Sequence, residues 1–287
     1  MRVPASLLAV FGAMAICTSL IAQTAPAPAT PFKAPAVDGW TGRSMVLKAP
    51  QNSAPAPRRD LTGTWNPMNG ASDGIQAFGA KNMPDDGKPE HALPYTPEGV
   101  LAFTSHHPGF GTRFVEPSRI DDPVNFCDPQ GMPRQDLYEM RTTQILQNAK
   151  QVVVLYEYNK IWRTIWADGR QLPTDPEPQW YGYSTGTWVD DYTFVAQTIG
   201  VDGRTWLDNA GRPHSDATHV EERFHRVSKD QLEITVTITD PKHYTKPWVA
   251  MDKFPMVLAP DDFHAREMVC SPSEYKKYLS TFAPDAQ

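Results

Sequence analysis

The sequence predicts a mainly β fold: an antiparallel meander that forms a barrel or a strongly curved sheet, with one or two short helices. From Gln144 onward β-branched and aromatic residues recur with a period of two, which is typical of half-buried strands. Turn residues separate these runs at short intervals, so consecutive strands are expected to pair antiparallel. Seven of the eight tryptophans lie at or after Trp65, which places the large aromatic side chains within the predicted sheet.

The first strand opens with Gly63, Thr64 and Trp65, and an irregular segment rich in Gly, Pro, Asn and Asp follows it. The later strands are predicted over residues 152–158, 161–167, 186–199, 219–227 and 232–240.

A helix is predicted between the first strand and the others. Thr96 suits the N-cap, Pro97 the first helical position and Glu98 the first turn, while Pro108 stops the helix. A second short helix is predicted over residues 133–140.

The chain divides into three predicted parts. Residues 1–22 have the basic start, apolar run and small final residues of a cleavable signal peptide, so we expect a periplasmic or secreted protein without a membrane span after cleavage. Residues 23–59 alternate Ala and Pro, which favours a disordered, extended linker. Residues 60–287 are predicted to form a single β-rich domain.

Charge narrows the classes of partner. The formal net charge is -6 with no basic run, which argues against nucleic acid as a partner. We expect a small-molecule ligand and no cofactor, and the oligomeric state stays open.

Two cysteines remain after the signal peptide is removed. Exported proteins rarely keep free thiols, so Cys127 and Cys270 are predicted to form a disulfide; two unpaired buried thiols are the alternative. A zinc site lacks the close-spaced cysteine pairs that such sites show.

The first hairpin is predicted to turn at Asn159 and Lys160, which sets Tyr156 opposite Arg163. Tyr156, Tyr158 and Arg163 then share one face, where a cation lies among aromatic side chains. We expect this face to bind the polar end of a ligand.

The second hairpin allows two registers. A three-residue turn at 228–230 places Val220, Glu222, Phe224 and Arg226 on the apolar inner face, whereas a two-residue turn exchanges the faces. The first register is preferred, because it clusters Phe224 and Val220 with the apolar residues of the next strand. Glu222 then needs a buried partner, either Arg226 or Arg163, and this ion pair is either structural or functional.

Residues 211–222 form the densest polar stretch of the chain. His214, Asp216, His219 and Glu222 are candidates for acid and base chemistry, although hydrogen bonds that order the loop explain the same residues. Their spacing matches no specific metal motif, so no metal site is predicted.

Four sequence blocks carry a resemblance to a known family. They are CDPQGMPR (127–134), DGRQLPTDPEPQWYGYSTGTW (168–188), TWLDNAGRPHSDATHVEERF (205–224) and TDPKHYTKPW (239–248). Together they resemble a family of exported β-rich proteins of soil bacteria, which implies an exported single domain and supplies no catalytic residue. The Gly-x-Trp opening at Gly63 also resembles lipocalin-type barrels, a likeness that concerns the fold alone.

Two functions from different classes follow. The first is an exported small-molecule-binding barrel with a polar and aromatic cavity, in which Arg163, Tyr156, Tyr158, Trp180 and Arg226 hold the ligand. The alternative is a secreted hydrolase, lyase or isomerase acting on a small oxygenated or aromatic molecule, with Glu222 or the His214 and His219 pair as acid and base. Whether the protein is an enzyme is left open by the sequence.

Overall fold

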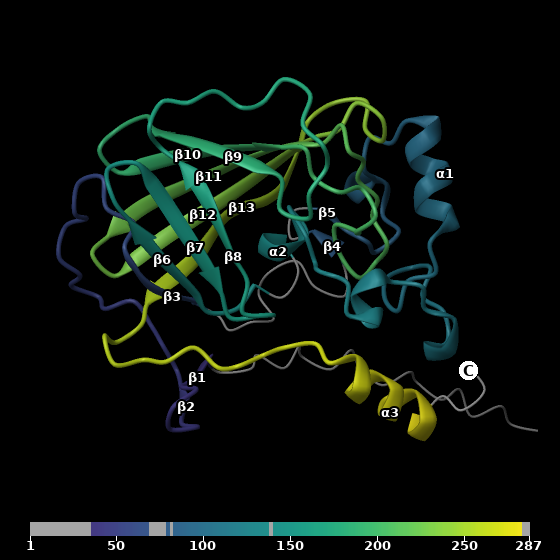
Figure 1. The fold of residues 1–287 in the computed structure, drawn as a ribbon, viewed down its shortest axis with the longest axis horizontal. Helices are drawn as coiled ribbons and strands as arrows, with labels where there is room; N and C mark the ends of the chain where they lie inside the picture. The colour runs from purple at the N-terminus through teal and green to yellow at the C-terminus, as the bar shows by residue number, and fades with distance from the viewer. Residues whose placement is uncertain (1–35, 69–78, 81–82, 138–139, 283–287) are drawn as a thin grey trace, which may run out of the picture. The chain divides into compact units, whose positions relative to one another are not determined.

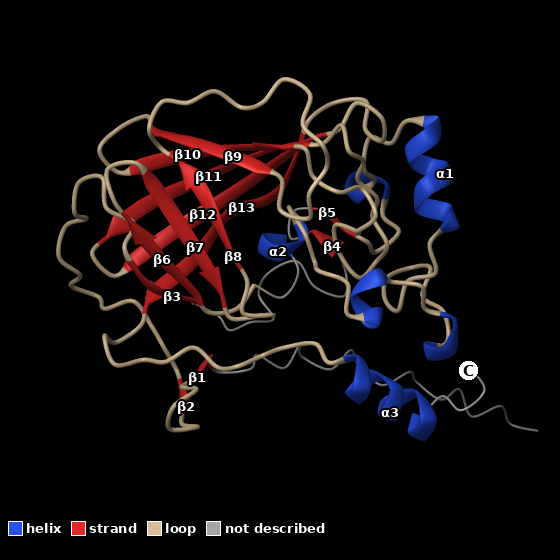
Figure 2. Cartoon of the chain, viewed as in Figure 1, coloured by secondary structure: helices blue, strands red, loops and turns tan. Residues whose placement is uncertain are grey.

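Nine strands close into a barrel in the computed structural model, which describes residues 36–68, 79–80, 83–137 and 140–282 (Figures 1 and 2). The predicted signal peptide lies outside the described residues. The barrel strands are β3 (Gly63–Pro67), β6 (Thr143–Gln147), β7 (Gln151–Tyr156), β8 (Trp162–Trp166), β9 (Tyr183–Trp188), β10 (Thr193–Ile199), β11 (His219–Ser228), β12 (Gln231–Thr239) and β13 (Trp248–Leu258). The predicted mainly β fold and barrel are confirmed.

Neighbouring strands in the barrel mostly follow the order of the chain. The order is β10, β11, β12, β13, β3, β6, β7, β8 and β9, with closure between β9 and β10. All neighbours are antiparallel except β8 and β9, which run parallel and pair through only two residue pairs, Ile165 with Ser184 and Trp166 with Thr185. This short parallel contact is the weakest seam of the barrel, because the other neighbours pair over three or more residues.

The remaining elements are short. The predicted helix is present as α1 (Pro97–Ser105), and its N-cap Thr96 accepts a hydrogen bond from the backbone N–H of Gly99 at 3.0 Å. Part of the second predicted helix is present as α2 (Arg134–Leu137); residues 138–139 lie outside the described residues. The other elements are α3 (Pro272–Phe282), the 3₁₀ turns η2 (Pro89–His91), η3 (Pro117–Arg119) and η4 (Pro123–Phe126), and the two-residue strands β1 (Ala36–Val37), β2 (Ser44–Met45), β4 (Gly79–Ala80) and β5 (Met83–Pro84).

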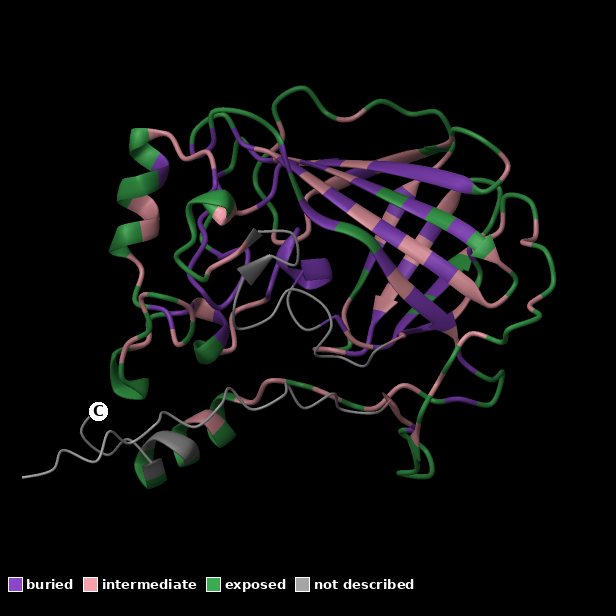
Figure 3. Ribbon diagram, turned by 180° about the vertical axis from the view of Figure 1, so that it is seen from behind, coloured by how far each residue is buried: buried purple, intermediate pink, exposed green. Residues whose placement is uncertain are grey.

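Buried and more exposed residues alternate along five of the barrel strands, β6, β7, β8, β11 and β12 (Figure 3), as the period of two in the sequence predicts. The inward side chains form one apolar cluster that includes Trp65, Phe194, Phe224, Ile234 and Phe254, each at most 2 % exposed. These residues fill the interior with large side chains, so the barrel has a packed core.

The β11–β12 hairpin has the preferred faces. Val220, Glu222, Phe224 and Arg226 lie opposite Ile238, Val236, Ile234 and Leu232, and all eight are buried. The turn itself contains two residues, because Ser228 pairs with Gln231, and a bulge at Val227 restores the face that the predicted three-residue turn gives.

The β7–β8 hairpin keeps the predicted faces in a different register. Arg163 lies opposite Val154, two residues from the predicted partner Tyr156, so the side-chain parity is unchanged. The connection covers the five residues 157–161, because Glu157 leaves the strand. Its carboxylate accepts a hydrogen bond from the backbone N–H of Thr142 and binds Arg266 at 2.9 Å.

The described part of the predicted linker, residues 36–59, contacts the rest of the chain. Ser53 donates a hydrogen bond to Asp230 at 2.7 Å, and Arg58 forms an ion pair with Asp191 at 2.9 Å. These contacts attach residues 53–59 to the ends of barrel strands, where the composition alone predicts an extended spacer. The domain boundaries and the signal peptide stay predictions.

The predicted disulfide between Cys127 and Cys270 is present, with a Cα–Cα distance of 5.3 Å across 143 residues of sequence. It joins the end of η4 to the residues that precede α3. Among the described residues, no helix has both the length and the apolar composition of a membrane span.

Candidate functional site

A buried group of polar side chains lies inside the barrel near α2. Arg163 of β8 donates a hydrogen bond from Nε to the Tyr156 hydroxyl at 2.9 Å and one from Nη2 to Glu222 Oε1. The Tyr156 hydroxyl donates in turn to Asp136 Oδ1 at 2.8 Å, and Asp136 Oδ2 lies 3.6 Å from Arg163 Nη2. We call Arg163, Tyr156, Glu222 and Asp136 the ion cluster.

The inward positions of three strands and one helix create this cluster. Arg163, Tyr156 and Glu222 occupy alternate, inward-facing positions of β8, β7 and β11, and each is at most 4 % exposed. Asp136 comes from α2, which lies beside the barrel in Figure 1 and which the bond to Tyr156 fixes in place. Of the two partners that the sequence offers for Glu222, the structure selects Arg163.

The cluster contains two carboxyl groups and one arginine. Burial is the largest cause that raises the pKa of Glu222; Arg163 opposes it and the charge of Asp136 supports it, and together they bring this pKa to about 8. Glu222 Oε2 and Asp136 Oδ2 are both buried without a donor, and a proton on Glu222 supplies a hydrogen bond from one to the other. Because its pKa lies above 7, Glu222 is mostly protonated at pH 7.

Arg163 also points toward a pocket where β8 and β9 separate. Its Nη1 lies 3.4 Å from Ser184 Oγ of β9, and Ser184 shares a hydrogen bond of 2.8 Å with Thr198 of β10. Because β8 and β9 pair through two residue pairs only, the strands leave an opening beside Arg163. Arg163 and Ser184 thus belong both to the buried interior and to the pocket wall.

The pocket has a volume of about 900 Å³, within the range of sites for drug-sized molecules. Aromatic side chains and three arginines dominate its wall. It is lined by Trp162, Arg163, Thr164, Trp166, Arg170, Gln171, Leu172, Pro173, Pro178, Gln179, Trp180, Tyr181, Gly182, Tyr183, Ser184, Thr185, Asp202 and Arg204.

Two Asp-Gly-Arg turns flank the pocket in the same way. Arg170 lies over the Trp166 ring at 3.6 Å and forms an ion pair with Asp168 at 2.7 Å. The second turn repeats this arrangement at residues 202–204, where the arginine lies 4.4 Å from the centroid of the Trp180 ring and 2.6 Å from its own aspartate. Each turn therefore presents a guanidinium group held between an indole ring and a carboxylate. The two Asp-Gly-Arg triplets are visible in the sequence, but no local pattern indicates that they lie at the same pocket.

The predicted ligand-binding residues fall in different places. Trp180 lines the pocket, and Tyr156 belongs to the ion cluster behind it. Tyr158 lies at a smaller cavity beside Cys270. Arg226 lies four residues along β11 from Glu222, over the Trp65 ring, and donates to backbone carbonyls at the β11–β12 turn. The structure thus brings Arg163 and Tyr156 together with Glu222 and places Tyr158 and Arg226 elsewhere.

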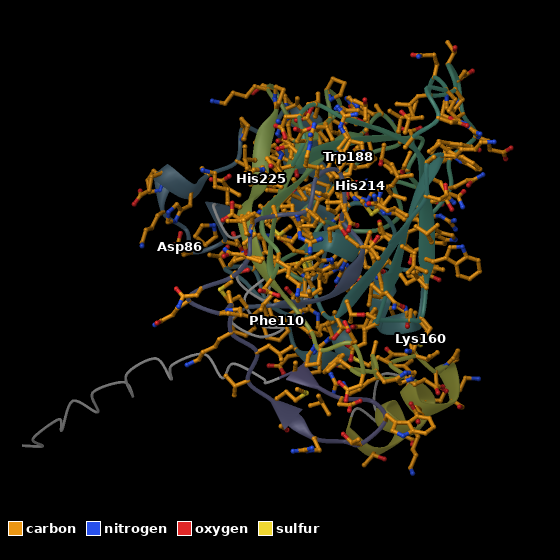
Figure 4. The ribbon with its side chains drawn as sticks, turned by 90° about the vertical axis from the view of Figure 1, so that its left-hand side faces the viewer. Asp86, Phe110, Lys160, Trp188, His214 and His225 are labelled. Atoms are coloured by element: carbon orange, nitrogen blue, oxygen red, sulfur yellow. A yellow bond between two sulfur atoms is a disulfide. The ribbon has the colours of Figure 1, made fainter. Side chains whose placement is uncertain are left out.

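The predicted histidine pair is not brought together. His214, labelled in Figure 4, is 1 % exposed and shares a hydrogen bond of 2.8 Å with Thr205, and burial lowers its pKa to about 4. His219 is half-buried on β11, where burial lowers its pKa, and Asp216 is exposed and contacts Lys242 at 3.3 Å. Among the described residues, no hydrogen bond or ion pair joins His214, Asp216 and His219 to one another or to the ion cluster.

Asp240 organises the polar loop instead. It accepts hydrogen bonds from the Ser215 hydroxyl at 2.8 Å and from the Thr218 hydroxyl at 3.1 Å. This is the loop-ordering role that the sequence offers as an alternative for residues 211–222. In the described ranges no group of three or more histidine, cysteine or acidic side chains is arranged to hold a metal.

A comparison with family models, curated proteins and solved structures found no match for the chain. The resemblance to exported proteins of soil bacteria therefore stays a prediction. The barrel that the lipocalin likeness implies is present as a fold, and the site is argued from its geometry alone.

Proposed function

We propose that this protein is an exported binding protein for a small, partly aromatic molecule, which it holds in the pocket between β8 and β9. The observation that carries the proposal is the opening at this seam, where three tryptophans surround a pocket of about 900 Å³ that reaches the buried Arg163. A flat molecule gains stacking area on Trp162, Trp166 and Trp180, and a polar atom of the molecule gains a hydrogen bond from Arg163.

The proposal moves the ligand site from the barrel interior to the barrel wall. The interior is filled by apolar side chains and by the ion cluster, whose members bind one another. Arg163 keeps its predicted role at the polar end of the ligand, and Trp180 keeps its role as an aromatic contact. Tyr156 contributes by orienting Arg163 through the bond to Nε.

A tryptophan fluorescence and thermal-shift screen with aromatic and sugar-like compounds tests this proposal. We expect aromatic compounds to quench the fluorescence and raise the melting temperature, and Trp180→Ala to weaken both effects. Trp40→Ala is the matched control, because Trp40 is 82 % exposed and does not line the pocket. Equal weakening by both variants, or no response to any aromatic compound, contradicts the proposal.

The second candidate function is an enzyme with Glu222 as general acid. The observation that favours it is the pair of carboxyl groups in which Glu222 keeps a proton at neutral pH. Against it, neither Glu222 nor Asp136 lines the pocket, and Arg163 stands between them and any bound molecule. Turnover of an aromatic ester or glycoside that Glu222→Gln abolishes, while binding is retained, establishes this second function.

A further inference from the structure

Most of the charged groups that line the pocket are hydrogen-bond donors. Three of its lining residues are arginines, Arg163, Arg170 and Arg204, and one, Asp202, is acidic, although the whole chain has a formal net charge of -6. The two carboxyl groups of the ion cluster lie behind Arg163 and do not reach the pocket wall. A ligand therefore meets guanidinium N–H groups before it meets any acceptor of the cluster.

The two Asp-Gly-Arg turns fix these donors in position. In each turn the aspartate oxygens accept hydrogen bonds from Nε and Nη2 of the arginine, at N···O distances of 2.6 to 3.2 Å. The indole ring covers one face of the guanidinium group. Among the described residues, Nη1 of Arg170 and Nη1 of Arg204 make no hydrogen bond, and the two side chains are 46 % and 69 % exposed. A planar guanidinium group held in this way matches a carboxylate better than it matches a neutral acceptor.

From this arrangement we infer that the ligand is an aromatic carboxylate: its ring lies among the tryptophans of the pocket, and its carboxylate takes the donors of Arg163, Arg170 and Arg204. The inference rests on the proposed binding function and adds the charge and the acceptor group of the ligand. The three guanidinium groups offer a cationic ligand no hydrogen-bond acceptor, so they do not favour its binding.

Three probes with the same ring system separate the possibilities in isothermal titration calorimetry at pH 7: 2-naphthoate, 2-naphthamide and 2-naphthylmethylammonium. We expect 2-naphthoate to bind about tenfold tighter than 2-naphthamide, since hydrogen bonds to a charged acceptor are about twice as strong as those to a neutral one. The ammonium probe should bind weakest. Binding of the amide as tight as that of the carboxylate overturns the inference and leaves the proposed function standing.

The double variant Arg170→Gln/Arg204→Gln localises the effect. It should weaken 2-naphthoate about tenfold and change 2-naphthamide by about threefold at most, because only the carboxylate depends on the charge of the two donors. Arg58→Gln/Arg223→Gln is the matched control: it removes the same charge from two exposed, ion-paired arginines that do not line the pocket. Equal loss in both double variants attributes the preference to net charge and overturns the inference.

Arg163→Lys adds a third measurement at the inner end of the pocket. It keeps the charge and loses the planar fork, and we expect it to weaken 2-naphthoate more than 2-naphthamide in a sample whose melting temperature shows it to be folded. If Arg163→Lys does not fold, the comparison of Arg170→Gln/Arg204→Gln with its control double variant decides the inference. Failure of all three naphthalene probes to bind removes the proposed function itself, a result distinct from the loss of charge preference alone.

Discussion

Replacing Arg163 by Met tests whether the ion cluster is held together as described. Arg163 is 4 % exposed and contacts Tyr156, Glu222 and Asp136, so its removal leaves two carboxyl groups buried without a cation. Breaking a buried charge pair on one side costs about 3 to 5 kcal/mol. Urea unfolding with the disulfide intact, followed by linear extrapolation, measures this loss at pH 7.

The pH dependence of Arg163→Met gives the same reasoning a second test. Arg163 lowers the raised pKa of Glu222, so without the arginine this folded-state pKa rises further above its unfolded value. The stability that Glu222 contributes is then fully present at low pH and is lost as pH rises through the folded pKa. The deficit should therefore be smaller at pH 5 than at pH 8. Arg170→Met, which breaks an exposed ion pair with Asp168, is the control and should unfold like the wild-type protein. A similar midpoint for the two variants at pH 7 refutes the described role of Arg163.

Three further outcomes are expected. Burial gives His214 a folded pKa of about 4, below its unfolded value of 6.5, so about 3 kcal/mol of stability is present above pH 6.5 and is lost as pH falls to 4. His214→Asn should flatten this part of the plot of unfolding free energy against pH, measured by urea unfolding. His225→Asn, at an exposed position, should leave it unchanged. Replacing Cys127 and Cys270 by Ser should lower the free energy of unfolding by about 5 kcal/mol in the chain-entropy model, a loss measured by urea unfolding and contradicted by an unchanged midpoint. Arg226→Met removes the donors to carbonyls at the β11–β12 turn and should cost about 2 kcal/mol by the same method, with binding in the pocket unchanged.

The faces of the strands could be predicted from the sequence, because burial alternates with a period of two and a shift of two residues leaves it unchanged. The β7–β8 hairpin shows the limit of this signal: its inward residues are right and its register is not. The displacement comes from Glu157, which binds Thr142 and Arg266, residues that no local pattern connects with it.

The candidate site could be predicted in part. Arg163, Tyr156 and Glu222 share inward faces, so their meeting follows from the strand pattern once the register of β11 is chosen correctly. Asp136 lies on α2, and nothing in residues 133–140 indicates that this short helix packs at the barrel. Arg226 shares the face of Glu222, but four strand residues separate the two by about 13 Å, which places Arg226 at the hairpin turn. The pocket was missed because it depends on the parallel pairing of β8 with β9, where a meander predicts antiparallel neighbours.

The position of the disulfide divides the barrel strands unequally. Strands β6 to β13 all lie between Cys127 and Cys270, whereas β3 precedes both cysteines. The oxidised chain is thus a covalent ring that carries eight strands, with the ninth on a free arm. Closure of the barrel then requires this arm to enter between β13 and β6, where it pairs through three residues on each side. Residues 63–67 therefore complete the closure of the barrel. A chain that lacks them retains the ring but has two unpaired strand edges, on β13 and β6, that can associate with other chains.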